Sequence, residues 1–278
     1  MDCRIIMDSV GDRTEQMKAE NTVRMVPLTI IIDGKEFRDD ETLDTMMLLR
    51  EIKNSKTCPR SACPSPEEYM DAYREAYPRE TFVVCASSKL TGCYNSALLG
   101  RQLFLEDHPD AQISVIDGLT ATPGSGLLAQ YILDLKDRLT FAELTDWIEK
   151  FRPRLQTRFV LEDLSFLEKN GRLSKLAAFL ARQLKIVPTL KAIEGEIVLS
   201  SQHRGVKRAL DRLFKEICDD LRKDPKELLM ISYCNCPERA AELRDRLTEE
   251  FRDLKIQIFP TGGIPTLYAG DHGIVTAY

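Results

Sequence analysis

Short apolar runs alternate with helical patterns along most of the chain. Residues 82–85 and 228–233 are mostly apolar runs that predict buried strands. Residues 66–76 and 141–151 repeat apolar side chains every three or four positions, which predicts helices with one buried face. This alternation predicts an α/β fold with mainly parallel sheets flanked by helices on both faces.

Small polar residues follow three of the predicted strands, at Asp8-Ser9, Ser87-Ser88 and Asp117-Gly118. Ligands of open α/β sheets bind at the carboxyl ends of the strands, so we expect these three ends to converge on one crevice. The Asp8 carboxylate has two equally good interpretations, since it can orient a ligand or cap the following segment.

The stretch 82–98 leads from a predicted strand into a predicted helix. Their junction contains the hydroxyl of Thr91 and the flexible backbone of Gly92. Unpaired amides at the start of a helix, together with the positive end of its dipole, favour a phosphate or carboxylate. The alternative is that Thr91 only caps an ordinary helix, because threonine is common at that position.

An irregular segment at 55–66 separates two predicted helices at 42–53 and 66–76. It contains three prolines and therefore cannot be a regular element. The segment is either a passive connection or a loop folded over a site.

The pattern changes character near Pro153. At roughly 100 to 200 residues per domain, a chain of 278 residues is long enough for two domains. We place them at 1–152 and 153–278. The loop 57–66 is then able to pack on the second domain, and the final strand is able to return to the first.

A helical apolar stripe follows the predicted boundary, formed by Leu173, Leu176, Ala177, Leu180 and Leu184. Most of it is typical of ordinary core. The small side chains of Ala177, Ala178 and Ala181 would, however, leave room for a bound apolar chain.

The second half continues with a predicted hairpin around Glu194-Gly195 and closes with a glycine-rich turn and a final strand. Between them, a helix begins with Arg204, Lys207 and Arg208, which are able to hold a phosphate or an acidic partner. A solvated helix face is the alternative.

Composition narrows the function classes. With 43% hydrophobic and 30% charged residues, the chain can bury a normal core. The net charge of −5 and pI near 5.5 argue against nucleic-acid binding, which needs clustered positive charge. We see no signal peptide and no apolar run of the roughly 18 residues that cross a membrane, so we expect a cytoplasmic protein without membrane insertion.

Eight cysteines raise the question of disulfides or a metal. Structural zinc prefers closely spaced cysteine pairs with two further ligands, and neither Cys58 with Cys63 nor Cys234 with Cys236 has that spacing. We expect free thiols in a reducing compartment and no metal site.

From about residue 4 to the C-terminus, the chain contains in order the motifs IMDSVGD, VPLTIIIDGKEF, SSKLTGCYNSA, VIDGLTATPGSG, LEKNGRLSKLAAFLARQLKIVPTLKAIEGEI, HRG and YAGDHG. This ordered set resembles the DegV family of bacterial fatty-acid-binding proteins. The resemblance implies two α/β domains with one long-chain fatty acid, such as palmitate or oleate, held between them. It also implies a carrier without cofactor or chemistry of its own, which presents the acyl chain to a separate fatty acid kinase.

The resemblance also assigns site residues. The family's carboxylate-binding loop falls on residues 61–65 and places its hydroxyl on Ser61, and a second motif, at 91–94, places another on Thr91. A family histidine corresponds to Tyr268, whose phenol donates a hydrogen bond but does not titrate near neutral pH. The implied carboxylate site consists of Ser61, Thr91, Gly92, Cys93 and Tyr268.

For the rest of the ligand, the resemblance implies an acyl-tail lining at Leu173, Ala177, Leu180 and Ala181. Arg172 and Arg204 match arginines of the family pattern and are implied contacts for a kinase or phosphate. Burying about 14 methylenes at roughly 0.8 kcal/mol each would supply about 11 kcal/mol, so the tail would provide most of the affinity.

Two other functions compete with a carrier. One is an enzyme acting on an acyl or phosphorylated substrate, with Cys93 or Cys85 as nucleophile and His272 as base. The other is nucleotide binding at the glycine-rich turn 123–126, although the chain has no complete phosphate-binding loop.

Overall fold

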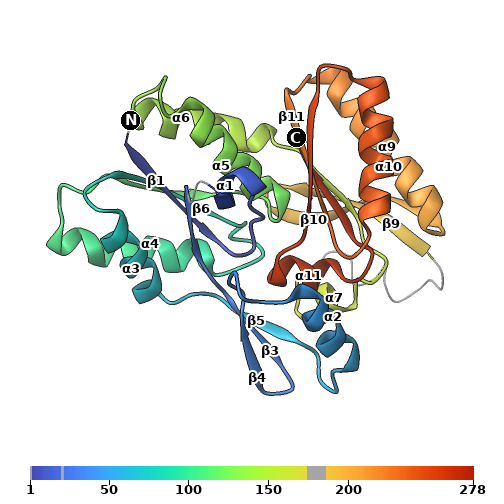
Figure 1. The fold of residues 1–278 in the computed structure, drawn as a ribbon, viewed down its shortest axis with the longest axis horizontal. Coiled ribbons are helices and arrows are strands. Elements are labelled where there is room, and N and C mark those ends of the chain that lie inside the picture. The colour runs from blue at the N-terminus through green and yellow to red at the C-terminus, as the bar shows by residue number, and fades with distance from the viewer. Residues whose placement is uncertain (1, 20–21, 174–185) are drawn as a thin grey trace.

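The protein consists of two lobes, each built on its own β-sheet (Figure 1). The computed structural model describes residues 2–19, 22–173 and 186–278. Four strands form the first sheet in the order β2-β1-β6-β7, and all three neighbouring pairs are parallel. Their bounds are β1 Cys3–Asp8, β2 Val23–Val26, β6 Glu80–Cys85 and β7 Ile113–Asp117.

Helices cover both faces of the first sheet, as the alternating pattern predicts. Side chains of a strand point to opposite faces in turn, so Ile6 packs toward α3 and α4, whereas Ile5 and Met7 pack toward α5 and α6. These helices are α3 Pro66–Ala76, α4 Cys93–Asp107, α5 Pro123–Leu135 and α6 Phe141–Phe151. A short α1, Glu15–Ala19, contributes Met17 to the second of these cores, and a 3-10 turn, η1 Arg152–Arg154, leads out of the lobe.

Six strands form the second sheet, in the order β10-β9-β8-β13-β11-β12. The α/β class is confirmed, but the prediction of mainly parallel sheets is wrong for this one, because only β11 and β12 pair in parallel. The final strand lies between β8 and β11 and does not return to the first sheet. The strands are β8 Thr157–Val160, β9 Ile186–Ile193, β10 Glu196–Arg204, β11 Leu228–Tyr233, β12 Lys255–Pro260 and β13 Ile274–Ala277.

The second sheet also lies between layers of helices. Helices α9, Val206–Lys223, and α10, Pro237–Glu250, cover one face, and α5 of the first lobe packs against β11 and β13. The two lobes therefore share α5. No helix in the described part of the chain is long and apolar enough to cross a membrane.

A small antiparallel sheet and three short helices complete the described structure near the junction of the lobes (Figure 1). The segment 23–32 breaks at Pro27, so that β2 ends one sheet and β3 enters another. The predicted turn at Asp33-Gly34 joins β3 to β4, with both residues at positive φ. The elements are β3 Thr29–Ile32, β4 Lys35–Arg38, β5 Arg60–Ala62, α2 Thr45–Asn54, α7 Ser165–Lys169 and α11 Gly263–Ala269.

Helix α11 corrects the predicted glycine-rich turn before the final strand. Pro265 lies in its first turn, where proline is compatible with a helix, and Gly270 ends it at φ 68°. The predicted tail-lining residues Ala177, Leu180 and Ala181 lie outside the described residues.

Candidate functional site

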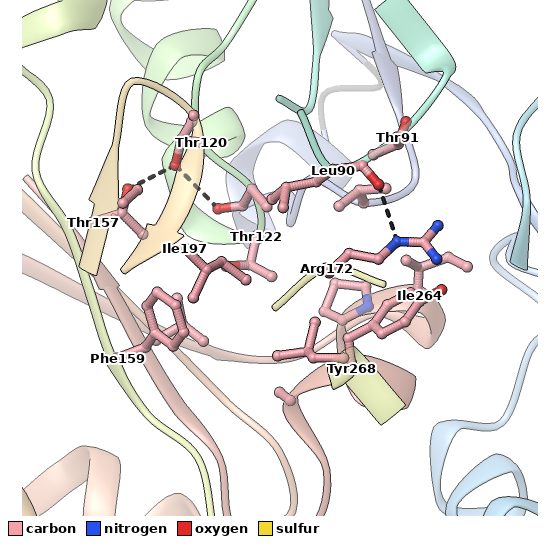
Figure 2. Close-up of a pocket in the computed structure, with 18 of the residues that line it drawn as sticks. Leu90, Thr91, Thr120, Thr122, Thr157, Phe159, Arg172, Ile197, Ile264 and Tyr268 are labelled. Carbon is pink, nitrogen blue, oxygen red and sulfur yellow. Dashed lines mark hydrogen bonds between the residues drawn. The ribbon is translucent and has the colours of Figure 1, made fainter. Parts of the chain in front are cut away.

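An apolar cavity lies at the junction of the two lobes (Figure 2). The first lobe contributes loop residues that follow its strands, and the second contributes side chains of β8, β10, β13 and α11. Its apolar lining includes Val10, Leu28, Leu90, Phe159, Leu161, Ile197, Ile264 and Val275. Such a lining suits a hydrocarbon ligand, because binding is favoured when apolar surfaces of the ligand and the cavity are removed from water.

One end of this cavity carries three hydroxyls from three distant parts of the sequence. Ser61 on β5, Thr91 before α4 and Tyr268 on α11 all line it. The Ser61 Oγ and the Tyr268 hydroxyl are 2.8 Å apart and hydrogen-bonded. All three residues are only partly buried, so this end lies near the surface.

The Thr91 hydroxyl is held with its oxygen toward the helix. The Cys93 amide donates a 2.8 Å hydrogen bond to Thr91 Oγ1, so the hydroxyl proton points elsewhere and is able to reach a ligand. Gly92 and not Thr91 is the N-cap residue of α4, so Thr91 binds the first amide of the helix from the preceding position and keeps its own proton for a ligand. Gly92 and Cys93 do not line the cavity; they form the backbone that positions Thr91.

The segment 57–66 is a folded structure and not a passive connection. The Asn170 side-chain amide donates to the Pro59 carbonyl at 3.0 Å, and the Ser96 hydroxyl donates to the Pro64 carbonyl at 2.5 Å. A methyl group on Gly92 would lie 3.1 Å from the Cys63 sulfur, so the segment packs closely on the start of α4. These contacts hold Ser61 against the cavity.

Arg172 brings positive charge to the same end. Its Nε donates to the Leu90 carbonyl at 3.2 Å, and its guanidinium carbon lies 5.5 Å from the centre of the Tyr268 ring. Arg204, at the end of β10, is exposed and does not line the cavity. The structure thus brings only one of the two predicted arginines to the site.

The polar strand ends converge as predicted, but they bind one another. Asp8 accepts the Ala86 amide at 2.8 Å, and Asp117 accepts the Ser88 hydroxyl at 2.5 Å. The Ser87 hydroxyl donates to the Gly195 carbonyl at 2.7 Å, which fixes the tip of the β9–β10 hairpin to the first lobe. None of these four side chains lines the cavity, so their role is structural.

The cysteine chemistry does not favour a nucleophile. Cys85 and Cys93 are fully buried, and burial, reinforced by the Asp8 carboxylate, raises the pKa of both thiols. His272 lies in an exposed turn and does not line the cavity. All eight cysteines lie in the described part of the chain as free thiols. The described residues include no group of His, Cys, Asp or Glu side chains that could hold a metal ion.

Two buried carboxylates hold the start of α11, the helix that carries Tyr268. Asp39 accepts the amides of Gly263 and Ile264 at 2.8 and 2.9 Å. Asp12 accepts the Gly262 amide at 3.0 Å and the Ser232 hydroxyl at 2.7 Å. Burial raises the pKa of both groups, that of Asp12 to about 7.

The raised pKa of Asp12 predicts a pH-dependent stability. Below the unfolded-state pKa of 3.8 its contribution to stability is fully present, and it is lost as the pH rises through about 7, where the buried group becomes charged. We expect Asp12→Asn to raise the unfolding temperature at pH 8 by a few degrees and to flatten its fall between pH 5 and 8. Thermal unfolding of the wild-type protein and of Asp12→Asn, measured between pH 5 and 8, checks this prediction. Unfolding temperatures that change with pH in the same way in both proteins would contradict it.

Sequence patterns missed most of the apolar lining and three further hydroxyls, on Thr120, Thr122 and Thr157. Threonine is common on strands and in turns, so these positions carry no local signal. The proline and flanking glycines of α11 were a usable signal, since they mark the start and end of a short helix.

An apolar cavity with hydrogen-bond donors collected at its outer end is typical of a protein that binds a small ligand. The family model described as "Uncharacterised protein, DegV family" matches residues 2–277. The chain belongs to the DegV family.

Individual relatives agree with this assignment. A DegV domain-containing protein of Streptococcus pneumoniae is 34% identical over 282 residues, which cover 100% of this chain and 99% of the relative. A DegV family protein of Ruminococcus gnavus, refined with vaccenic acid, has a TM-score of 0.94 at 36% identity, with 100% of both chains covered. The Fatty Acid Kinase B3 protein of S. pneumoniae, loaded with linoleic acid, has a TM-score of 0.88 at 31% identity, covering 100% of this chain and 99% of that one.

Proposed function

We propose that this protein binds one long-chain fatty acid in the cavity between its lobes and presents the carboxylate to a separate fatty acid kinase. The observation that carries the proposal is the distribution of polarity, with an apolar interior and three hydroxyls and an arginine at the half-buried end. The two solved relatives described above carry vaccenic and linoleic acid, and one is named as a fatty acid kinase protein.

We place the carboxylate at Ser61, Thr91 and Tyr268. The Ser61 and Tyr268 hydroxyls bind each other, and a carboxylate could accept both protons instead. Thr91 offers a third proton because its oxygen already accepts the Cys93 amide. A buried carboxylate needs such donors, since leaving its oxygens unpaired costs several kcal/mol.

The tail would extend from this end into the interior of the cavity, past Leu90 and Ile264 toward Phe159 and Ile197 (Figure 2). Leu173, which is 2% exposed, packs in the core that includes Phe159 and Leu161. It is therefore proposed as support for the wall around the tail.

The proposed partner would approach the head-group end. Arg172 lies between the cavity and the surface, so its charge can face the ligand's carboxylate and an acyl phosphate formed from it. Arg204 is exposed on the second lobe and would contact the partner and not the ligand. We propose no chemistry by the protein itself, since burial keeps the Cys93 thiol protonated.

Native mass spectrometry of the purified protein tests the proposal. We expect a complex with one fatty acid per chain, which denaturing extraction releases and identifies. A protein that is empty as purified and takes up neither palmitate nor oleate would contradict it.

A further inference from the structure

A second group of hydroxyls lines the cavity, away from the proposed carboxylate end. Figure 2 shows Thr120 and Thr157 together on one side of the view, with Thr91, Arg172 and Tyr268 on the other. The two threonines are 2% and 5% exposed, so their hydroxyls are buried polar groups in an apolar wall. Thr157 begins β8, whereas Thr120 belongs to the loop after β7, so the group joins the two lobes.

In the Thr120–Thr157 pair, one of the two hydroxyl protons has no good hydrogen-bond acceptor among the described residues. The Thr120 and Thr157 hydroxyl oxygens are 2.7 Å apart, which uses one of the two protons. The other described acceptor is the Ala121 carbonyl, 3.4 Å from Thr120 Oγ1, which is long for a hydroxyl donor. The pair can therefore offer a proton to a third oxygen while keeping its own bond.

Thr122 adds an unpaired hydroxyl to the same lining. Its Oγ1 is shielded from water and has no hydrogen-bond partner among the described residues. Its φ of 52° and ψ of −121° are unfavourable for a β-branched residue. The conformation is held from both sides, because the Thr122 amide donates to Val10 and the Thr122 carbonyl accepts from Asp12, each at 3.1 Å. Strained, unsatisfied polar groups of this kind concentrate at binding sites.

We propose that Thr120, Thr122 and Thr157 form a second polar subsite, which recognises an oxygen carried on the acyl chain. The preferred ligand would then be a hydroxy or oxo fatty acid, an assignment that rests on the proposed function. A hydroxyl oxygen accepts the spare proton of the threonine pair or the Thr122 proton, and its own proton finds a lone pair on a threonine. An unsubstituted chain leaves these groups as they are, so it still binds, but less tightly.

Competition binding with stearate and its 10-hydroxy and 12-hydroxy derivatives tests the subsite. We expect the wild-type protein to bind at least one hydroxy acid about tenfold more tightly than stearate, as one additional buried hydrogen bond allows. Thr120→Val with Thr157→Val removes both hydroxyls without stranding either. This double variant should bind stearate and the preferred hydroxy acid with equal affinity, and Thr122→Val should reduce the preference in part.

Ser61→Ala is the matched control, because it should weaken stearate and the hydroxy acids equally and leave their ratio unchanged. An unfolding temperature close to that of the wild type shows that each variant is folded. A wild-type protein without preference for any isomer, or a preference that survives the double variant, overturns the subsite. Failure of every acid to bind instead overturns the proposed function itself.

Discussion

Replacing Ala192 with phenylalanine is expected to weaken palmitate binding by about a hundredfold or more. Ala192 lies on β9 opposite Ile197 of β10, and both line the cavity. A phenyl ring there would fill the space of roughly four methylenes. At about 0.8 kcal/mol for each methylene, the loss is roughly 3 kcal/mol, which is about a hundredfold in the dissociation constant. Isothermal titration with palmitate measures it.

Ile193→Phe provides the matched control, since it adds a ring to the next residue of the same strand. Successive side chains of a strand point to opposite faces, and Ile193 is 47% exposed. We expect palmitate affinity to stay at the wild-type value. Octanoate should suffer less than palmitate from Ala192→Phe, because a short chain leaves more of the cavity empty. Unchanged palmitate affinity in Ala192→Phe would show that the tail does not pass beside β9.

The first lobe could be predicted closely because its information is local. The apolar run at 82–85 and the helical period at 66–76 correspond to β6 and α3 with little change at their ends. The strand order of the second sheet could not be predicted from the sequence, since it depends on pairings between distant segments. The final strand pairs with β8 and β11 in antiparallel orientation, and no residue of β13 carries a signal for either neighbour.

The candidate site likewise contains residues that the local sequence could predict and others that it could not. Ser61 and Tyr268 are separated by 207 positions, so only the resemblance to a known family pairs them before the structure does. The hydroxyls of Ser87 and Ser88 have the pattern expected of a ligand site, yet they satisfy Gly195 and Asp117. Hydroxyl content in a loop therefore predicts hydrogen bonding, but not whether the partner is a ligand or the protein.

The proposed head-group site makes the second large prediction. Ser61→Ala together with Tyr268→Phe should weaken palmitate about a hundredfold, because it removes two of three hydroxyl donors and preserves the apolar shape. Hydrogen bonds to a charged group contribute about 1.5 to 3 kcal/mol each, and the two losses need not add because these hydroxyls contact each other at 2.8 Å. Thr91 remains as a donor, so binding should be reduced but not abolished.

The ligand's charge separates this effect from a loss of packing. Methyl palmitate carries an uncharged ester, whose carbonyl oxygen accepts weaker hydrogen bonds than a carboxylate, so the double variant should lose much less affinity for it than for palmitate. Ser55→Ala with Tyr77→Phe is the matched control, because it also removes one serine and one tyrosine hydroxyl. These hydroxyls lie outside the cavity, where they donate to the Ile52 carbonyl and the Asp110 carboxylate. That control should leave palmitate binding unchanged. Equal losses for palmitate and its methyl ester would mean that the substitutions reshape the cavity, and that the carboxylate is held elsewhere.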